Sequence, residues 1–328
     1  MNLKKILENE YNINAKGFNS QTGGWASLAF EVISNNRTYF LKAYEKSRAS
    51  TPKWTSLIDE YIPIINWFNN NTALNGKIIK PIKTINGNYK CEDDKAIYIL
   101  FEFIYGTTIG DKNLTEEQIK SLAEIISELH SYGKEIPIAT DKIREDFKLP
   151  FCLSLKEFFE NDITIDSSGI RDSIGPFYPK ILELIHVTEN LAKILLEMKL
   201  KFVLCHTDLH NWNFMQTENN LILIDWEGLK LAPVEADMFF LVDKPYYEKF
   251  IDIYKHRHQD FEINEKVLLF YRLRRKLEDI WEWMELIYFD NLDDNEKQNS
   301  LHYLMEECHS IQHIPNYSAL IIDREGRS

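Results

Sequence analysis

Short blocks of hydrophobic residues alternate with polar turns over the first third of the chain. Apolar runs cover residues 27–33, 38–43 and 96–103, and glycine and asparagine turns separate them. Short apolar runs between turn residues are typical of β-strands. One helix, from about residue 54 to 68, is predicted to interrupt the strands. The opening part of the chain is therefore predicted to form a small sheet with one helix.

The pattern changes to helical spacing beyond Thr115. Thr115 has Gln118 three positions later, the spacing of a capping box at the start of a helix. Further helices are predicted at residues 178–200 and 267–291, with one hairpin before the last of them, formed by residues 213–216 and 221–225. The apolar residues after the capping box recur every three or four positions, at Ile119, Leu122, Ala123, Ile126 and Leu129.

These patterns predict an α+β fold of two lobes. The first lobe, residues 1–104, is expected to hold a small antiparallel sheet with one helix, and the second, residues 105–328, to be larger and mainly helical. No internal repeat or proline-rich linker occurs in the 328 residues, so the boundary is expected to be a hinge. No long apolar run opens the sequence. We therefore expect neither a signal peptide nor a membrane span, and a cytoplasmic location.

Charge and cysteine content argue against some classes of partner and site. A formal net charge of -13 disfavours nucleic acid, whose phosphates would be repelled. A cationic small substrate would be attracted, although many acidic enzymes bind no cation. The four cysteines are scattered without a C-x-x-C pair, which argues against a zinc site and a disulfide framework. They are predicted to be reduced core residues: Cys91, Cys152, Cys205 and Cys308.

The residue types that phosphoryl transfer needs lie in one short stretch. This reaction uses a carboxylate near the attacking hydroxyl and oxygen ligands for Mg²⁺, which neutralises charge on the phosphates. Asp208, Asn213 and Asp225 supply these types. A tight turn after Asp208 and a hairpin after Asn213 are predicted to bring the three side chains together. A lone aspartate on a loop is more often a cap or turn residue, which is the alternative interpretation.

Around these residues the sequence resembles the aminoglycoside phosphotransferase family and, more loosely, the protein kinases. The loop reads His206-Thr-Asp-Leu-His-Asn-Trp-Asn213, and the later elements read Ile224-Asp-Trp-Glu227 and Pro233-Val-Glu-Ala-Asp237. The resemblance implies a protein-kinase-like fold and an ATP-dependent phosphotransferase with an alcohol group as acceptor. Residues 203–210, 231–233 and 271–280 look most like the spectinomycin phosphotransferase branch.

The resemblance implies a role for each residue of the loop. Asp208 is expected to act as the base or to orient the substrate hydroxyl, and Asn213 and Asp225 to bind Mg²⁺. His206 and Asp237 are expected to support the loop. His210 is interpreted as a loop histidine rather than a catalytic one. The phosphoryl donor is expected to be ATP or GTP.

The resemblance also implies a nucleotide site in the first lobe. Kinases hold the α- and β-phosphates with a lysine on a strand, and Lys42 follows apolar neighbours at such a place. Its partner is expected to be an acid on the next helix. Glu60 is predicted, with Asp59 and Glu45 as alternatives, and a solvated salt-bridge face is the competing interpretation.

Two more segments are predicted to contact the nucleotide. Gly23 and Gly24, with Ser27, are expected to let backbone amides approach phosphate oxygens, although paired glycines more often form an ordinary hairpin turn. Main-chain groups of Glu102 and Ile104 are expected to bind the adenine edge at the hinge. A plain sheet strand is the alternative there.

The acceptor is predicted to be small. Only seven residues separate Asp225 from Pro233, too few for the activation segment of a protein kinase. Ammonium groups of an aminocyclitol would need carboxylates and aromatic faces, but arginines four positions before two of the carboxylates offer ordinary helix ion pairs instead. The candidate acceptor residues are Glu278, Asp279, Glu282 and Trp283, with Glu285 and Trp281 beside them.

Three hypotheses follow for the function. The first is a kinase that phosphorylates a hydroxyl of an aminocyclitol or aminoglycoside antibiotic, as in antibiotic resistance. The second is a metabolic kinase for choline, homoserine, a thioribose or a sugar. The third is a catalytically silent kinase-like binding protein, which the presence of Lys42, Asp208, Asn213 and Asp225 argues against. A monomer or weak dimer is expected, without nucleic acid or membrane partners.

Overall fold

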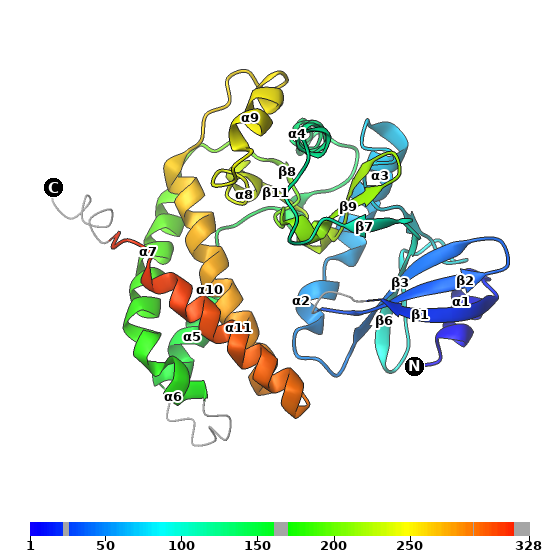
Figure 1. Cartoon of the computed structure of the whole chain (residues 1–328), viewed down its shortest axis with the longest axis horizontal. Coiled ribbons are helices and arrows are strands. Elements are labelled where there is room, and N and C mark those ends of the chain that lie inside the picture. Colours follow the sequence, from blue (N-terminus) through cyan, green and yellow to red (C-terminus); the bar gives the residue numbers. More distant parts are fainter. Residues whose placement is uncertain (22–25, 161–169, 291, 318–328) are drawn as a thin grey trace. The chain divides into compact units, whose positions relative to one another are not determined.

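A computed structural model describes residues 1–21, 26–160, 170–290 and 292–317. By its internal contacts the chain forms two units, one of Met1–Glu145 with Lys201–Glu262 and one of Asp146–Leu200 with Ile263–Ser328. The α+β fold class is confirmed, since an antiparallel sheet forms early in the chain, after one short helix, and helices dominate later (Figure 1). The predicted lobe boundary after residue 104 falls inside the first unit and stays a prediction.

The sheet of the first unit is antiparallel throughout. Its strands follow the order β1-β2-β3-β6-β4, and β5 also pairs with β6. The three apolar runs of the sequence are the strands β2, β3 and β6, as predicted. The strands are β1 (Ala15–Gln21), β2 (Leu28–Ser34), β3 (Thr38–Glu45), β4 (Pro81–Ile82), β5 (Lys90–Glu92) and β6 (Ala96–Glu102).

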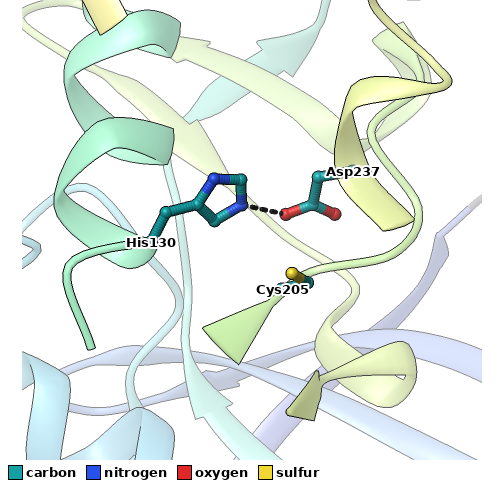
Figure 2. Close-up of side chains that lie close together, drawn as sticks. All are labelled: His130, Cys205 and Asp237. Atoms are coloured by element: carbon teal, nitrogen blue, oxygen red, sulfur yellow. Dashed lines mark hydrogen bonds and ion pairs between the residues drawn. The ribbon is translucent and has the colours of Figure 1, made fainter. Parts of the chain in front are cut away.

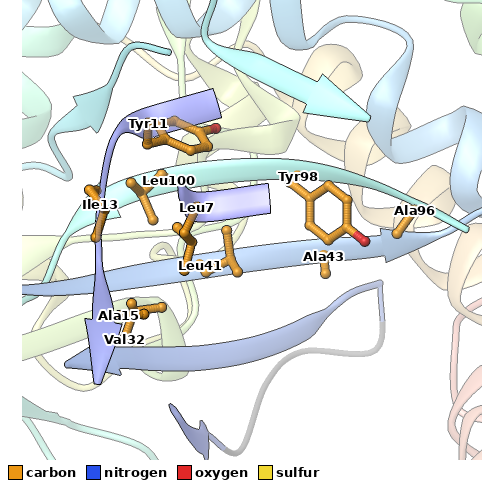
Figure 3. Packing of buried hydrophobic residues seen from close by; sticks show 10 residues of the cluster. All are labelled: Leu7, Tyr11, Ile13, Ala15, Val32, Leu41, Ala43, Ala96, Tyr98 and Leu100. Carbon is orange, nitrogen blue, oxygen red and sulfur yellow. The ribbon is translucent and has the colours of Figure 1, made fainter. Parts of the chain in front are cut away.

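Helix α1 (Leu3–Tyr11) packs on one face of this sheet (Figure 3). Its Leu7 meets Leu41 of β3 and Leu100 of β6 in a cluster of buried side chains. Because successive residues of a strand point to opposite faces, Leu41 and Ala43 join this cluster while Lys42 and Tyr44 point to the other side. The alternation of β3 thus separates the core from the side that carries the lysine.

The helix predicted at residues 54–68 is divided in two. Helix α2 (Thr51–Thr55) ends, and α3 (Ile58–Asn71) begins after Leu57, whose φ of -105° and ψ of 10° leave the helical range. By contrast, the capping box predicted at Thr115 is present. Its hydroxyl accepts the Gln118 amide at 3.3 Å, and the Gln118 side chain accepts the Thr115 amide at 2.9 Å.

Short strands and helices complete the first unit. Strand β8 (Val203–Cys205) pairs with β11 (Lys230–Ala232), and β9 (Phe214–Thr217) forms the predicted hairpin with β10 (Leu221–Leu223). Strand β7 (Gly106–Thr108) extends this hairpin by pairing with β9. Helix α4 (Glu116–Leu129) packs on α9 (Tyr247–Lys255), and α8 (Glu235–Met238) follows β11.

The second unit is helical in the part that the structure describes. Helix α10 (Glu265–Phe289) packs against α7 (Tyr178–Glu197), α11 (Asp294–Gln312) and α5 (Pro150–Glu160), and α6 (Ile170–Ile174) contacts α11. Aromatic stacking also joins two of these helices, since the rings of the partly buried Phe159 of α5 and Tyr178 of α7 have centroids 4.1 Å apart. Among the described helices, none is long and apolar enough to cross a membrane.

Leu41→Ala is expected to lower the free energy of unfolding by about 2–5 kcal/mol, because it leaves a cavity at the centre of the sheet core. Ile33→Ala on the neighbouring strand is the matched control, since that side chain is 37% exposed and should cost much less. Urea unfolding of both variants checks this. Equal losses would mean that the α1 face is not the core of the sheet.

Candidate active site

The loop after β8 brings the predicted catalytic aspartate and asparagine into direct contact. The Asn213 side-chain amide donates to Asp208 Oδ2 at 2.8 Å and to the Asp208 carbonyl at 2.9 Å. His210 Nε2 lies 3.2 Å from the same Asp208 oxygen. Asn213 is 2% exposed, so its amide holds the Asp208 carboxylate from the buried side. The predicted turn is therefore present.

His206 supports the loop from beneath. It is fully buried, and its Nδ1 accepts the backbone amide of Asp208 at 3.3 Å. Its Nε2 lies 2.8 Å from the carbonyl of Ile224, which can only accept, so this nitrogen carries the proton. One ring thus joins the catalytic loop to the hairpin strand that leads to Asp225.

The Asp237 carboxylate holds the start of the loop. It accepts the backbone amides of His206 at 3.0 Å and Thr207 at 2.5 Å. The fully buried carboxylate also accepts from His130 Nε2 at 2.9 Å, and His130 Nδ1 lies 2.9 Å from the Tyr254 hydroxyl. Thr207 adopts φ of +69°, which is unfavourable for a β-branched residue, so these bonds hold the loop in a strained conformation.

His130, Cys205 and Asp237 form a buried cluster with ligand atoms within 4.8 Å of one another (Figure 2). A metal ion there would need the thiolate of Cys205. Instead, the Cys205 sulfur lies 3.5–3.7 Å from the carbonyl oxygens of Val203, Ala232 and Pro233, an environment that suits a protonated thiol. Burial, with the carboxylate of Asp237 nearby, raises the pKa of this thiol well above its ordinary value. The cluster is therefore a structural support of the loop.

Asp225 follows β10 at the entrance of the short 3-10 helix η4 (Trp226–Gly228). It adopts φ of +61°, an uncommon value for a residue other than glycine. The preceding residue, Ile224, donates its amide to the Asn213 carbonyl at 3.0 Å, so the hairpin ties the two predicted metal ligands together through the backbone. Trp226 is fully buried and packs its ring 4.9 Å from that of His206.

Oxygen ligands for Mg²⁺ fit this arrangement. The amide nitrogen of Asn213 is engaged with Asp208, which leaves its amide oxygen as the atom that would bind a cation. Asp225 offers a carboxylate that is 34% exposed. Carboxylate and amide oxygens are ligands that Mg²⁺ accepts. The donor set therefore suits the predicted metal, and the metal role of both residues stays a prediction.

Lys42 of β3 lies between two carboxylates. Its ammonium is 2.6 Å from Asp225 Oδ1 and 2.5 Å from Glu227 Oε1, and Tyr44 donates its hydroxyl to the same Glu227 oxygen at 2.5 Å. Burial alone lowers the pKa of Lys42, but Asp225 and Glu227 more than reverse this and raise the pKa above its ordinary value. Lys42 is therefore a charged side chain held close to the predicted metal ligand.

The prediction that Glu60 pairs with Lys42 is wrong for this structure. Glu60 pairs with Lys142 at 2.5 Å, because its place on α3 directs it to a partly exposed surface. The two alternatives are also engaged elsewhere, since Asp59 pairs with Lys90 at 2.7 Å and Glu45 with Arg48 at 3.6 Å. The partner of Lys42 comes instead from the turn that follows Asp225.

The remaining nucleotide residues are only partly described. Gly23 and Gly24 lie outside the described residues, and Ser27 is buried just before β2. The Glu102 amide donates to the Lys80 carbonyl at 2.9 Å, and the Glu102 side chain pairs with Lys80 at 3.0 Å. The amide of Glu102 is thus already bonded to the residue that precedes β4. Its adenine contact, and that of Ile104, stays a prediction.

The candidate acceptor residues lie on α10 in the second unit. Glu278 pairs with Arg274 at 2.9 Å and Asp279 with Arg275 at 2.8 Å, the helix ion pairs that were the alternative interpretation. Trp283 stacks on Tyr303 of α11, with ring centroids 5.1 Å apart. Glu282 is near enough to Asp279 to raise the pKa of that carboxyl. Acceptor binding by these residues stays a prediction.

Several residues that build the site are not predicted from the sequence. Glu227 lies in one of the family motifs but has no predicted role, and Tyr44 is not a predicted site residue. Tyr44 was detectable, because residues two apart on a strand share a face and Lys42 was already predicted to point into the site. His130 gave no local signal, since it is 107 residues from Asp237, its partner.

Comparison with known proteins extends these findings. A model of the phosphotransferase enzyme family matches residues 20–265. A spectinomycin phosphotransferase in complex with ADP and spectinomycin has a TM-score of 0.72 at 21% identity, covering 94% of this chain and 97% of that chain. A microcompartment-associated aminopropanol kinase has a TM-score of 0.64 at 11% identity, covering 94% and 95%. An amicoumacin kinase with AMP-PNP and Ca²⁺ has a TM-score of 0.60 at 14% identity, covering 97% and 96%.

Asp237→Ala is expected to lower the free energy of unfolding by about 3 kcal/mol or more, because it leaves the amides of His206 and Thr207 and the His130 ring without their acceptor. Asp252→Ala on the exposed side of α9 should change it by only about 0.5 kcal/mol. Chemical denaturation measures both. Equal values would show that Asp237 does not support the loop.

Asp279 predicts a pH-dependent stability. Burial, opposed by Arg275, raises the pKa of Asp279 from 3.8 to about 7. The folded chain therefore holds this proton more tightly than the unfolded chain, and the stabilisation present below pH 4 is lost as the pH rises through 7. Asp279→Asn should gain stability relative to the native chain over that range, on the order of 2 kcal/mol.

Thermal unfolding of both proteins between pH 4 and pH 8 checks this difference. The exposed Asp260→Asn is the matched control, and its stability curve should run parallel to that of the native chain. A parallel curve for Asp279→Asn as well would contradict the assignment.

Proposed function

The chain belongs to the phosphotransferase enzyme family and is an ATP-dependent phosphotransferase acting on hydroxyl groups, and from this premise we propose that its acceptor is an aminocyclitol or aminoglycoside of the spectinomycin kind. The motifs between His206 and Asp237 predicted this family membership. The observation that supports phosphoryl transfer is the Asp208 carboxylate, held by Asn213 at 2.8 Å, together with the pair of Asp225 and Lys42 at 2.6 Å.

In the proposed mechanism Asp208 accepts the proton of the substrate hydroxyl as that oxygen attacks the γ-phosphorus of ATP. The bond from this phosphorus to the β–γ bridging oxygen breaks, and ADP leaves. A positioned general base contributes roughly 10²- to 10⁴-fold in rate. Asn213 fixes the orientation of the carboxylate, and His206 and Asp237 fix the backbone that carries it. When bound at Asn213 and Asp225, Mg²⁺ would neutralise the charge that develops on the phosphates. Lys42 would bind phosphate oxygens beside it.

One observation supports a small acceptor and another supports an amine-bearing one. The short segment between Asp225 and Pro233 leaves no room for a peptide-docking activation segment, so a small molecule is favoured. The similar structures include enzymes whose names specify spectinomycin, aminopropanol and amicoumacin. We further propose that carboxylates of α10, Glu282 among them, and the Trp283 ring take part in binding the ammonium groups.

A metabolic kinase is the second candidate function. The likeness to an aminopropanol kinase favours a small amino alcohol, and choline or another small hydroxylated compound would fit the same machinery. A catalytically silent binding protein is disfavoured, because Lys42, Asp208, Asn213 and Asp225 are all present and hydrogen-bonded in two connected groups.

Asp208→Ala is expected to keep Mg·ATP binding and to lose at least about 10²-fold in kcat, because the base acts on the acceptor hydroxyl rather than on the nucleotide. Steady-state kinetics and calorimetric titration with Mg·ATP measure the two effects separately. Unchanged turnover would remove Asp208 from the mechanism.

Asp225→Ala is expected to show the complementary pattern. Loss of the carboxylate should weaken ATP binding in the presence of Mg²⁺ by about tenfold or more, and should affect binding in EDTA far less. The titration is run with and without the metal. If the affinity for Mg·ATP stays at the native value, Asp225 is not a metal ligand.

A thermal-shift panel tests the acceptor. Spectinomycin, aminoglycosides, choline, 1-amino-2-propanol and sugars are added to the full chain with magnesium and a non-hydrolysable ATP analogue. A ligand at about a hundred times its dissociation constant should add roughly 2.7 kcal/mol of stability. Phosphorylated product from the stabilising compound, seen by mass spectrometry, would confirm it, and silence of all the antibiotics would favour the metabolic candidates.

A further inference from the structure

We propose that Glu227, held by Tyr44, is the residue that positions the Lys42 ammonium for the nucleotide. It takes the role that the sequence analysis predicted for Glu60. The inference rests on the proposed function, because it concerns the lysine of the same nucleotide site. It assigns a positioning role to Glu227 and Tyr44, neither of which is assigned to metal or substrate binding.

One oxygen of Glu227 accepts two donors. Oε1 lies 2.5 Å from the Lys42 ammonium and 2.5 Å from the Tyr44 hydroxyl. The side chains of Lys42 and Glu227 are 13% and 11% exposed, and Tyr44 is fully buried. In such a poorly hydrated place a charge-assisted hydrogen bond is strong and restricts the geometry of both partners.

The Tyr44 hydroxyl donates to Glu227, because an ionised carboxylate oxygen can only accept. Burial, together with the adjacent Glu227 carboxylate, raises the pKa of Tyr44 well above its ordinary value, so the proton stays on the hydroxyl. Because Tyr44 is two residues after Lys42 on β3, both side chains leave the strand on the same face. Strand β3 therefore carries both Lys42 and Tyr44, the residue that holds the Glu227 partner of Lys42.

Glu227 itself stands on a rigid turn. It belongs to η4, whose Trp226 is fully buried and donates its indole N–H to the Leu223 carbonyl at 2.9 Å. The Trp226 ring packs between Phe68 of α3, with ring centroids 6.2 Å apart, and His206. Glu227 is thus fixed by the same packing that supports the catalytic loop.

The two carboxylates around Lys42 have separable tasks. Asp225 offers a side chain that is 34% exposed and that suits a metal, whereas Glu227 is nearly buried and shares its oxygen with Tyr44. When Asp225 serves a cation, Glu227 is the acid that remains to hold the lysine. The acids of the sequence prediction do not compete, since Glu60 and Asp59 pair with Lys142 and Lys90.

The test compares Glu227→Gln, Tyr44→Phe and Glu60→Gln with a matched control, Glu92→Gln, which removes the carboxylate of an exposed pair with Lys46 on the same sheet. Turnover of Mg·ATP by the full chain is measured with spectinomycin as acceptor, or as ATP hydrolysis by water if spectinomycin is not phosphorylated. Each protein is assayed over a range of Mg²⁺ concentrations, and its fold is checked by circular dichroism.

Glu227→Gln is expected to lower kcat by about 10- to 100-fold, since a misplaced phosphate-binding group costs this much, with the KM of the acceptor unchanged. Tyr44→Phe should lower kcat by about threefold to tenfold. The Mg²⁺ concentration for half-maximal rate should not move in either variant. In a Lys42→Met background, neither substitution should lower the residual rate or the ATP affinity further.

Three results would overturn the inference. The first is a native kcat in Glu227→Gln. The second is a loss of kcat in Glu227→Gln that added Mg²⁺ restores, which would make Glu227 a metal ligand. The third is a loss of kcat in Glu60→Gln that Glu227→Gln does not show. If Glu227→Gln fails to fold, Tyr44→Phe decides alone, because it removes only a hydroxyl. Failure of the native chain itself to bind or use ATP would refute the proposed function, and this differs from any of these three results.

Discussion

The acceptance of two consecutive backbone amides by the buried Asp237 carboxylate is the interaction on which the site depends. These amides belong to His206 and Thr207, the first residues of the loop that carries Asp208. Without an acceptor of full negative charge, two donors and the His130 ring would be buried unpaired, which is costly in a region that excludes water. The chain thus uses one charge from α8 to fix a loop whose Thr207 occupies an unfavourable backbone region.

A series of hydrogen bonds connects this anchored loop to the hairpin. His206 connects the loop amide of Asp208 to the Ile224 carbonyl, and Ile224 connects in turn to the carbonyl of Asn213. Asp225 then leaves the hairpin with a positive φ that sends its carboxylate toward Lys42. The backbone that carries Asp208, Asn213 and Asp225 is therefore held by hydrogen bonds to neighbouring residues, and two turns of the site, at Thr207 and Asp225, adopt positive φ.

Local signals in the sequence were sufficient for some elements and insufficient for others. The capping box at Thr115 and the strand at residues 38–43 were predicted correctly, because both depend on residues within a few positions of each other. The contact between Asp208 and Asn213 followed for the same reason. The partner of Lys42 could not be derived locally, since Glu60 and Glu227 both lie on elements other than that of Lys42 and only the tertiary arrangement brings Glu227 to it. The break between α2 and α3 could not be predicted either, because no proline or glycine stands at Leu57 to indicate it.

The pairing of β7 with β9 has a mechanical consequence. A side chain at Gly106 would place its first carbon 2.5 Å from the Gln216 carbonyl, so only glycine allows the connecting strand to lie this close to the hairpin. The connection between the sheet and the loop region is therefore clamped from Gly106 onward, while the Tyr105 hydroxyl just before it binds Thr38 of β3. The two attachments are made by consecutive residues, Tyr105 to the sheet and Gly106 to the hairpin, so the chain has no slack between them.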